Sequence, residues 1–315
     1  MHILMLNEME VQRLLDLDEL LDALAKEFKA LSSGLVAAPK RNEVSVPNTG
    51  FLFSKSAYRH GREVTVKLVS GFDGNERLGI PTHQALICLF DPETGTPLAV
   101  MDGAYITALR TGGAAALSTR LLARTDTCVL AIIGAGVQGR AHLKMMSRVR
   151  PFSKIRIASR HFAHAEQLAA TDSRVLAVET AEEAVRGADV VCLCTSAAEP
   201  VISPDWLAPG AHVTSVGYRP VGGELDPRVI ARGRLYVETR LAFEPPPVGC
   251  GELAGLDPNT GTELGEVLLG RSLGRQSKDE LTIYKSMGHA CEDMAAASLV
   301  YHHAKQDGAG QMVAL

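Results

Sequence analysis

Three glycines in the stretch LAIIGAGVQGRAHL are the first residues whose spacing points to chemistry. Gly134, Gly136 and Gly139 form the pattern G-x-G-x-x-G, directly after the aliphatic run TCVLAII and before a segment with helical spacing. In this context backbone amides and a helix N-terminus can bind a pyrophosphate. The first glycine makes the turn, the second leaves room for the phosphates, and the third lets helix and strand pack closely. The pattern therefore predicts a dinucleotide site rather than a purely structural turn.

The end of the next predicted strand, KIRIAS, indicates which dinucleotide binds. An NAD site usually has Asp or Glu there, about 20 residues after the glycines, to bind the ribose 2′-hydroxyl. Here the strand ends in Ser159, Arg160 and His161. An arginine can pair with a 2′-phosphate, although an exposed arginine at a strand end is also common. The sequence therefore favours NADP(H), with NAD(H) as the alternative.

Three cations in the N-terminal region could bind an anionic substrate: Arg41, Lys67 and Arg110. Lys67 interrupts the run EVTVKLVS on the face opposite Val64, Val66 and Leu68, and the pattern alone is typical of solvated surface cations. Arg110 differs because Gly112 and Gly113 follow it. A glycine inside a helix costs about 1 kcal/mol relative to alanine, so the pair indicates a helix start or a close backbone approach beside this arginine.

Two kinds of secondary structure must position these residues. Apolar spacing of three and four predicts a helix over residues 8–33, short strands with turns follow from about 42 to 101, and a helical connection begins near 105. After that, strands alternate with helices, and the segments beyond the Pro-rich loop FEPPPVG are predicted to be helical. We expect an α/β chain with a doubly wound parallel sheet and an α+β part with antiparallel strands.

Composition narrows the possible classes of protein. A chain of 315 residues, 46% hydrophobic and 22% charged with a net charge of −4, fits two globular domains and gives no reason to expect nucleic acid or an anionic membrane as a partner. No apolar run is long enough for a membrane helix, and no signal peptide is apparent. Cys192 and Cys194 fit two buried thiols on one strand better than a metal pair. We expect a cytoplasmic protein without a metal site.

The ordered motifs TALRTGGAAALSTRLLAR, LAIIGAGVQGRAHL, TELGEVLLGR and LTIYKSMG resemble the ornithine cyclodeaminase/μ-crystallin family over nearly the whole chain. The resemblance implies a homodimer. Residues 1–114 and 289–315 would form a substrate-binding and dimerisation domain, and residues 115–288 an NAD(P)-binding Rossmann domain.

The resemblance also implies roles for single residues. Arg41 and Arg110 would bind the α-carboxylate of a small amino-acid or imino-acid substrate, Lys67 would be catalytic and close to the reacting carbon and nitrogen, and Thr82 would lie near the substrate. The predicted cofactor contacts are Thr111, Gly134, Gly136, Val137, Gln138, Gly139, Ser159, Arg160, Thr195, Ser286 and Gly288.

The chemistry implied is hydride exchange between nicotinamide C4 and the α-carbon of an amino acid or its imine. Cyclodeaminases of this family use an aspartate soon after the strand here written HVTSVG, where this chain has Tyr218 and Arg219; Glu224 and Asp226 are poor substitutes. We therefore expect an NAD(P)-dependent ketimine reductase or amino-acid dehydrogenase. The alternatives are an ornithine cyclodeaminase, which forms proline and ammonia, and a non-catalytic NADPH-binding protein of the crystallin type.

Overall fold

The chain divides into two compact units in the computed structural model, which describes residues 1–314. Unit 1 comprises Met1–Arg110 together with the chain from His289 onward, and unit 2 comprises Thr111–Gly288. The first boundary lies within helix α3 (Ala104–Leu122), which also contains the position predicted from the sequence, between residues 114 and 115. Unit 1 is therefore built from both ends of the chain.

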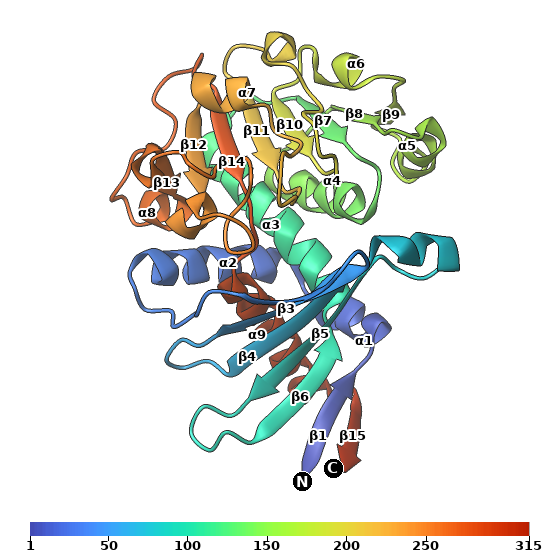
Figure 1. Ribbon diagram of the computed structural model, residues 1–315, viewed down its shortest axis with the longest axis vertical. Coiled ribbons are helices and arrows are strands. Elements are labelled where there is room, and N and C mark those ends of the chain that lie inside the picture. The colour runs from blue at the N-terminus through green and yellow to red at the C-terminus, as the bar shows by residue number, and fades with distance from the viewer. Residues whose placement is uncertain (315) are drawn as a thin grey trace. The chain divides into compact units, whose positions relative to one another are not determined.

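Unit 1 contains a mixed sheet, to which the described residues contribute seven strands in the order β15-β1-β6-β5-β4-β3-β2. β1 runs parallel to β6, and all other neighbours are antiparallel. β1 and β15 lie side by side near the marked chain ends (Figure 1). The strands are β1 (His2–Leu6), β2 (Asn42–Val46), β3 (Gly50–Ala57), β4 (Val64–Gly71), β5 (His83–Phe90), β6 (Pro97–Asp102) and β15 (Gln311–Ala314).

Two helices, α1 (Glu8–Leu14) and α2 (Leu17–Ser32), replace the single helix predicted over residues 8–33. Asp16 separates them because its side chain accepts hydrogen bonds from the amides of Asp18 and Glu19 and so begins α2 as an N-cap. No described helix is both long and apolar enough to cross a bilayer.

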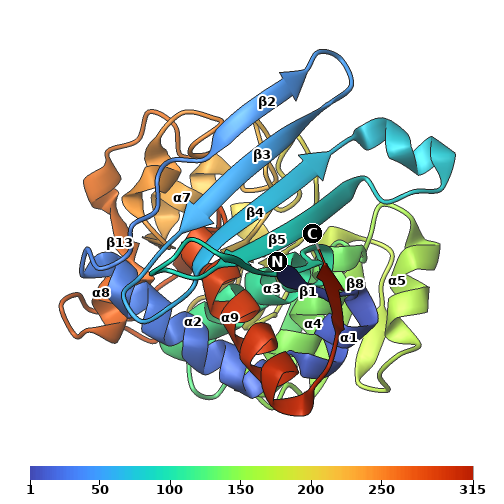
Figure 2. The same cartoon turned by 90° about the horizontal axis from the view of Figure 1, so that it is seen from below.

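The terminal helix α9 (Ala290–Asp307) contacts α2 and the strands β3, β4 and β5 (Figure 2). Because side chains alternate between the faces of a strand, one face of these strands is turned toward α9 and the other away from it. The face toward α9 holds the apolar core of this sheet: Phe53, Ala57, Ile87, Leu89, Ala99 and Met101.

Unit 2 is a parallel sheet, built from eight strands within the described part of the chain, with helices against it (Figure 1). Its order is β13-β12-β14-β11-β10-β7-β8-β9. The strands are β7 (Val129–Ile133), β8 (Lys154–Ala158), β9 (Val175–Ala177), β10 (Val190–Leu193), β11 (His212–Ser215), β12 (Arg234–Val237), β13 (Gly261–Glu263) and β14 (Thr282–Lys285). The helices are α4 (Val137–Val149), α5 (Phe162–Ala169), α6 (Ala181–Val185), α7 (Pro227–Arg232) and α8 (Leu264–Leu268). Together the two sheets confirm the predicted fold class.

The strand β14 corrects the sequence interpretation, which took the region after the Pro-rich loop as helical. Its four residues, TIYK, are fully buried and pair with β11 on one side and β12 on the other. β-Branched and aromatic residues suit such a central strand, but a run of four is too short to show a period of its own beside a long helical pattern.

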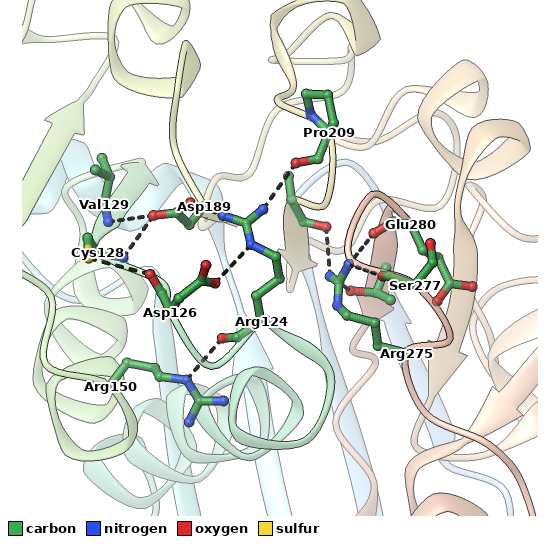
Figure 3. Close-up of polar contacts among 12 residues, drawn as sticks. Arg124, Asp126, Cys128, Val129, Arg150, Asp189, Pro209, Arg275, Ser277 and Glu280 are labelled. Atoms are coloured by element: carbon green, nitrogen blue, oxygen red, sulfur yellow. Dashed lines mark hydrogen bonds and ion pairs between the residues drawn. The ribbon is translucent and has the colours of Figure 1, made fainter.

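Three arginines bind the loops at the amino-terminal edge of the parallel sheet (Figure 3). Arg124 bonds the Asp189 carboxylate at 2.5 Å and the Pro209 carbonyl at 3.1 Å, and Asp189 also accepts the amide of Val129 at 2.9 Å. Arg150 and Arg275 donate to further carbonyls of the same region. This edge is therefore filled by structural contacts, which leaves the carboxyl edge as the place for ligands in a sheet of this type.

The glycine pair lies inside α3 and not at a helix start, and Gly112 marks a close backbone approach. A Cβ atom on Gly112 would lie 3.0 Å from backbone atoms of Ala141 in α4. Glycine at this position lets α3 and α4 pack at short range within unit 2.

Candidate functional site

Lys67 is buried in unit 1, with 1% of its side chain exposed. It points to the α9 side of the sheet, and its Nζ lies 2.8 Å from Oδ1 of Asp293 in the first turn of α9. Its register neighbours are Lys55 on β3 and Ile87 on β5. The residue that interrupts the strand pattern is thus an internal cation rather than a solvated one.

Arg110 binds the same carboxylate. Its Nε lies 3.0 Å from Oδ1 of Asp293, and its Nη1 lies 3.1 Å from Oε2 of Glu292. The second oxygen of Glu292 accepts the amide of His289 at 2.5 Å, so this side chain also helps to cap α9. A buried ion-pair cluster therefore joins β4, α3 and α9 within unit 1.

The cluster changes the ionisation of its members. Burial lowers the pKa of Lys67 to about 8, although the nearby Asp293 carboxylate opposes this, and Arg110 lowers it further. Burial alone would raise the pKa of Asp293, but the charges of Arg110 and Lys67 bring it down to about 2. Near neutral pH Asp293 is an anion, and Lys67 is a cation that can lose its proton within a short pH range.

The other two residues predicted to contact substrate lie at different distances from this cluster. Arg41 precedes β2, and its guanidinium carbon lies 4.9 Å from the ring centre of Phe53, which is two residues before Lys55 on the same face of β3. Thr82 precedes β5, five residues before Ile87, the register partner of Lys67. At about 3.3 Å per residue this places Thr82 roughly 16 Å along the strand, so the structure does not bring it into the cluster.

The glycine turn has the geometry expected of a dinucleotide site. Gly134 adopts φ +106°, and a Cβ on it would lie 2.5 Å from the carbonyl oxygen of Cys194. A Cβ on Gly139 would lie 2.0 Å from the carbonyl oxygen of Gly134, whereas a Cβ on Gly136, the N-cap of α4, would meet nothing within 4 Å. Two glycines are required by packing, and the middle one faces open space.

Several other predicted cofactor contacts lie around this turn in unit 2. Val137 begins α4, and the buried side-chain oxygen of Gln138 has no hydrogen-bond partner among the described residues. Ser159 and Arg160 follow β8, and Thr195 follows β10, the strand next to β7 in the sheet. The ends of β7 and β10 form the switch point of the sheet, where such folds bind nucleotides. The open space at Gly136 and the unsatisfied oxygen of Gln138 fit a dinucleotide there. Thr111, which was also predicted to contact the cofactor, is buried in α3.

A buried carboxylate holds the segment that contains Ser286 and Gly288. Glu238, which follows β12, accepts the Ser286 hydroxyl at 2.6 Å, the Met287 amide at 3.0 Å and the Gly288 amide at 3.0 Å. Glu238 therefore fixes this segment at the carboxyl edge of the parallel sheet.

Glu224 links the ends of two strands through hydrogen bonds that occupy both of its oxygens. It accepts the amide and hydroxyl of Thr195, both at 2.7 Å, and the hydroxyl of Ser215 at 3.0 Å. It also accepts the amides of Val216 and Gly217. With five donors on its two oxygens, this buried carboxylate fixes the ends of β10 and β11.

The segment where a cyclodeaminase would have its aspartate contains no acid in this chain. Arg219 donates to the carbonyl of Ser196 at 2.7 Å. Asp226 is the N-cap of α7 and pairs with Arg228 at 2.7 Å. Like Glu224, Asp226 is therefore occupied by structural contacts.

Sequence reasoning missed three members of the unit 1 cluster: Lys55, Glu292 and Asp293. A signal existed for the acids, which are adjacent in the otherwise apolar run HACEDMAAASLV, where acids favour a helix N-terminus. Lys55 shares strand parity with Phe53 and Ala57, which identifies it as a buried position once β3 is aligned with β4.

Comparisons with known proteins agree with these two units. The model of the ornithine cyclodeaminase/mu-crystallin family matches residues 1–308. This chain belongs to that family. Ketimine reductase mu-crystallin of Mus musculus is 39% identical over 285 residues, which cover 89% of this chain and 90% of the mouse protein.

Solved structures extend the likeness to the whole chain. The Delta(1)-pyrroline-2-carboxylate reductase of Thermococcus litoralis in complex with NADH and L-proline superposes with a TM-score of 0.93 at 32% identity and covers 99% of this chain and 100% of its own. An archaeal alanine dehydrogenase dimer with bound NAD has a TM-score of 0.90 at 30% identity, with both chains fully covered. All three relatives are oxidoreductases by name.

The last and the middle glycine of the turn, Gly139 and Gly136, predict contrasting variants. Gly139→Ala places a Cβ into a carbonyl oxygen, so we expect it to lower the free energy of unfolding by about 2–3 kcal/mol. Gly136→Ala meets no atom and keeps an allowed φ of −78°. It should therefore retain stability while weakening NADPH binding about 10-fold or more, because the methyl group enters the space for the phosphates. Urea unfolding and NADPH fluorescence titration measure the two effects. Unchanged NADPH affinity of Gly136→Ala would contradict the assignment of the turn.

Proposed function

We propose that this chain is an NAD(P)-dependent oxidoreductase that reduces the C=N bond of α-imino acids or, in reverse, oxidises the corresponding amino acids. The observation that carries the proposal is the buried Lys67, which Asp293 holds beside Arg110. Such a cluster combines a cation for a carboxylate with an amine whose pKa of about 8 suits proton transfer near neutral pH.

Three residues of unit 1 have different roles in this proposed reaction. Arg41 and Arg110 hold the substrate α-carboxylate through charge-assisted hydrogen bonds. Lys67 donates a proton to the imine nitrogen as the α-carbon is reduced, and accepts one in the oxidative direction. The bound nicotinamide supplies the hydride. The relatives support this assignment because they include a ketimine reductase and a reductase of a cyclic imino acid.

The occupied carboxylates favour reduction over cyclodeamination. Loss of ammonia with ring closure needs an acid/base at the position where this chain has Tyr218 and Arg219. The nearest acids in the sequence are Glu224 and Asp226. Glu224 accepts hydrogen bonds from five donors. Asp226 caps α7 and pairs with Arg228. Ornithine cyclodeamination is accordingly the outcome that we do not expect in the assay.

NADP(H) is the preferred cofactor in this proposal. The segment after β8 presents the exposed Arg160 and no carboxylate. A guanidinium there would bind a 2′-phosphate, and nothing at the position repels it. The buried thiols and the composition fit the reducing cytoplasm as the place of action.

A homodimer forms through the outer face of the unit 1 sheet in this proposal. On the face turned away from α9, Val44 pairs with Leu52 and Leu68 pairs with Leu86, and all four are exposed. Cross-strand apolar pairs on an open sheet face are suited to cover one another in a second copy.

The assay that tests the activity is NADPH oxidation with pyrroline-2-carboxylate or piperideine-2-carboxylate. We expect turnover that falls as pH rises through about 8, the pKa of Lys67, because only the protonated amine can donate. Asp293→Asn removes a charge that raises this pKa, so the alkaline limb of kcat/KM should move to lower pH. Asp126→Asn, on an exposed carboxylate of unit 2, is the control and should not move it.

NADPH binding without turnover of any imine or amino acid would contradict the activity and favour a binding protein. Ammonia release from ornithine with NAD would favour the cyclodeaminase. If the alkaline limb of kcat/KM lies at the same pH in Asp293→Asn as in the parent chain, the role of Lys67 is contradicted.

Arg160→Asp tests the cofactor preference. The variant exchanges an attractive charge for a repulsive one at the ribose, so the ratio of kcat/KM for NADPH over NADH should fall by about 100-fold. Steady-state kinetics with both cofactors measure the ratio. If it is unchanged, Arg160 does not face the 2′-phosphate.

Leu86→Glu tests the dimer. A buried carboxylate at each copy of the interface should dissociate it, and sedimentation velocity should then report a monomer. Leu78→Glu, at an exposed leucine of a 3-10 turn outside the strands, is the matched control and should remain dimeric. A monomeric parent chain, or a dimeric Leu86→Glu variant, would contradict this interface.

A further inference from the structure

One oxygen of the buried Asp293 carboxylate has no hydrogen-bond donor. Its Oδ1 accepts Lys67 at 2.8 Å and Arg110 at 3.0 Å, whereas its Oδ2 is buried and has no hydrogen-bond partner among the described residues. Burial raises the pKa of Asp293, but the charges of Arg110 and Lys67 lower it to about 2, so the group is an anion near neutral pH. A buried acceptor without a donor is costly, and a charged one more so. The cluster therefore lacks a donor at this oxygen.

Other buried carboxylates of the chain use both of their oxygens. Glu224 accepts five donors on its two oxygens, and Glu238 accepts donors from the segment after β14 on both of its own. Within the described part of the chain, one further carboxylate oxygen is buried without a hydrogen-bond donor, Oε2 of Glu252, and it lies in an ion pair with Lys285. At Asp293 both donors bind the same oxygen, so the second oxygen stands out as an acceptor that a ligand can use.

The proposed reaction supplies a donor of the right kind. When Lys67 has given its proton to the imine nitrogen, the substrate has an N–H group with a positive charge. A carboxylate oxygen is a strong acceptor for such a group, because the hydrogen bond is charge-assisted. The Lys67 amine lies 2.8 Å from Oδ1 of the same carboxylate, so the proton donor and the free acceptor belong to one pair of side chains.

A ketone of the same carbon skeleton would not fit this acceptor. Its carbonyl oxygen carries lone pairs and no hydrogen, so it would face the anionic Oδ2 with like polarity. A site built around a buried hydrogen-bonding group rejects the analogue that lacks the matching hydrogen. The free oxygen of Asp293 therefore distinguishes C=N–H from C=O.

We propose that Oδ2 of Asp293 accepts the N–H of the substrate nitrogen and thereby selects a protonated imine over the ketone of the same carbon skeleton. This inference rests on the proposed function for the reaction, but the contact itself can be measured by ligand binding without turnover. Asp293 transfers no proton. Lys67 forms the N–H bond and becomes a neutral amine, while the carboxylate stays ionised and binds the positive charge that results.

The binding test compares L-proline with (S)-tetrahydrofuran-2-carboxylate, a ring of the same size in which oxygen replaces the N–H. Calorimetry is done with saturating NADPH, to which L-proline cannot transfer hydride because both are reduced. At about pH 9, above the pKa of Lys67 of about 8, this amine is mostly uncharged and does not repel the ammonium of proline. The parent chain should bind L-proline about 10- to 100-fold tighter, the range expected for one charge-assisted hydrogen bond.

Asp293→Asn reverses the polarity of this position. Its carbonyl oxygen has to face Lys67 and Arg110, so its amide N–H group takes the place of Oδ2 and meets the ligand as a donor. The preference for L-proline should disappear or reverse. Asp307→Asn, at the exposed end of α9, is the matched control and should keep the preference of the parent chain. Thermal melting checks that both variants are folded, and the parent chain alone tests the preference if Asp293→Asn is not.

The kinetic test compares pyrroline-2-carboxylate with 2-oxopentanoate, which also has five carbons, with NADPH as reductant. In Asp293→Asn the ratio of kcat/KM for the imine over the ketone should fall by about 100-fold or more, because the amide now donates to a carbonyl oxygen. Both reductions need one proton from Lys67, so a change in the pKa of Lys67 affects both and cancels from the ratio.

The two tests separate the possible failures. Turnover of imines together with equal affinity of the parent chain for the two ring ligands would overturn this inference and leave the proposed function intact, since an internal water would then be the only donor to Oδ2. Absence of turnover together with an Asp293-dependent preference for L-proline would overturn the proposed function and support the nitrogen site. An equal loss of affinity for both ligands in Asp293→Asn would overturn the inference, because Asp293 would then support the fold in general. Failure of the parent chain to bind either ligand would overturn it as well.

Discussion

The buried carboxylate of Asp293 is the constraint on which the arrangement of unit 1 depends. Its Oδ1 accepts Lys67 at 2.8 Å and Arg110 at 3.0 Å, which fixes β4 and α3 against the first turn of α9. Two cations and a carboxylate removed from water are stable only while each has its partner. Burial lowers the pKa of Lys67 to about 8, and the Asp293 carboxylate keeps it from falling further. The contact that holds the last helix to the sheet therefore also keeps this amine protonated near neutral pH.

Unit 2 uses buried carboxylates in a comparable way at the carboxyl edge of its sheet. Glu224 binds the ends of β10 and β11, and Glu238 binds the segment after β14. Lys285 on β14 joins this edge through the carbonyl of Gly217 at 2.7 Å. Because these groups satisfy loop amides, the loops keep fixed positions around the glycine turn. The spacing in the sequence alone would allow these acids to be catalytic. In this fold they hold loops in place through hydrogen bonds.

Much of unit 2 was predictable because its signals are local. The aliphatic strand β7, the glycine turn and α4 follow one another in the sequence, and their alternation gives the parallel sheet. β14 was missed because four residues are too few to show a period. The break at Asp16 was missed because α1 and α2 together keep helical apolar spacing, and only the cap geometry separates them.

The candidate site of unit 1 was predictable only in part, since its members come from distant parts of the chain. Lys67 and Arg110 were found through an interrupted strand and a glycine pair, yet the pattern suggested solvated side chains. Their burial depends on Asp293, which lies 183 positions after Arg110. Lys55 becomes visible only when the register of β3 and β4 is known. Such pairings are tertiary and leave no trace in local spacing.

A double-mutant cycle on Lys67 and Asp293 tests the central claim most directly, with the free energy of unfolding as the measurement. Asp293→Leu alone leaves buried cations without their carboxylate and should cost about 3–5 kcal/mol. Lys67→Met combined with it should cost less than the sum of the single changes, by about 1 kcal/mol or more. Costs that add within about 0.5 kcal/mol would contradict the account, because the two side chains would then be energetically independent.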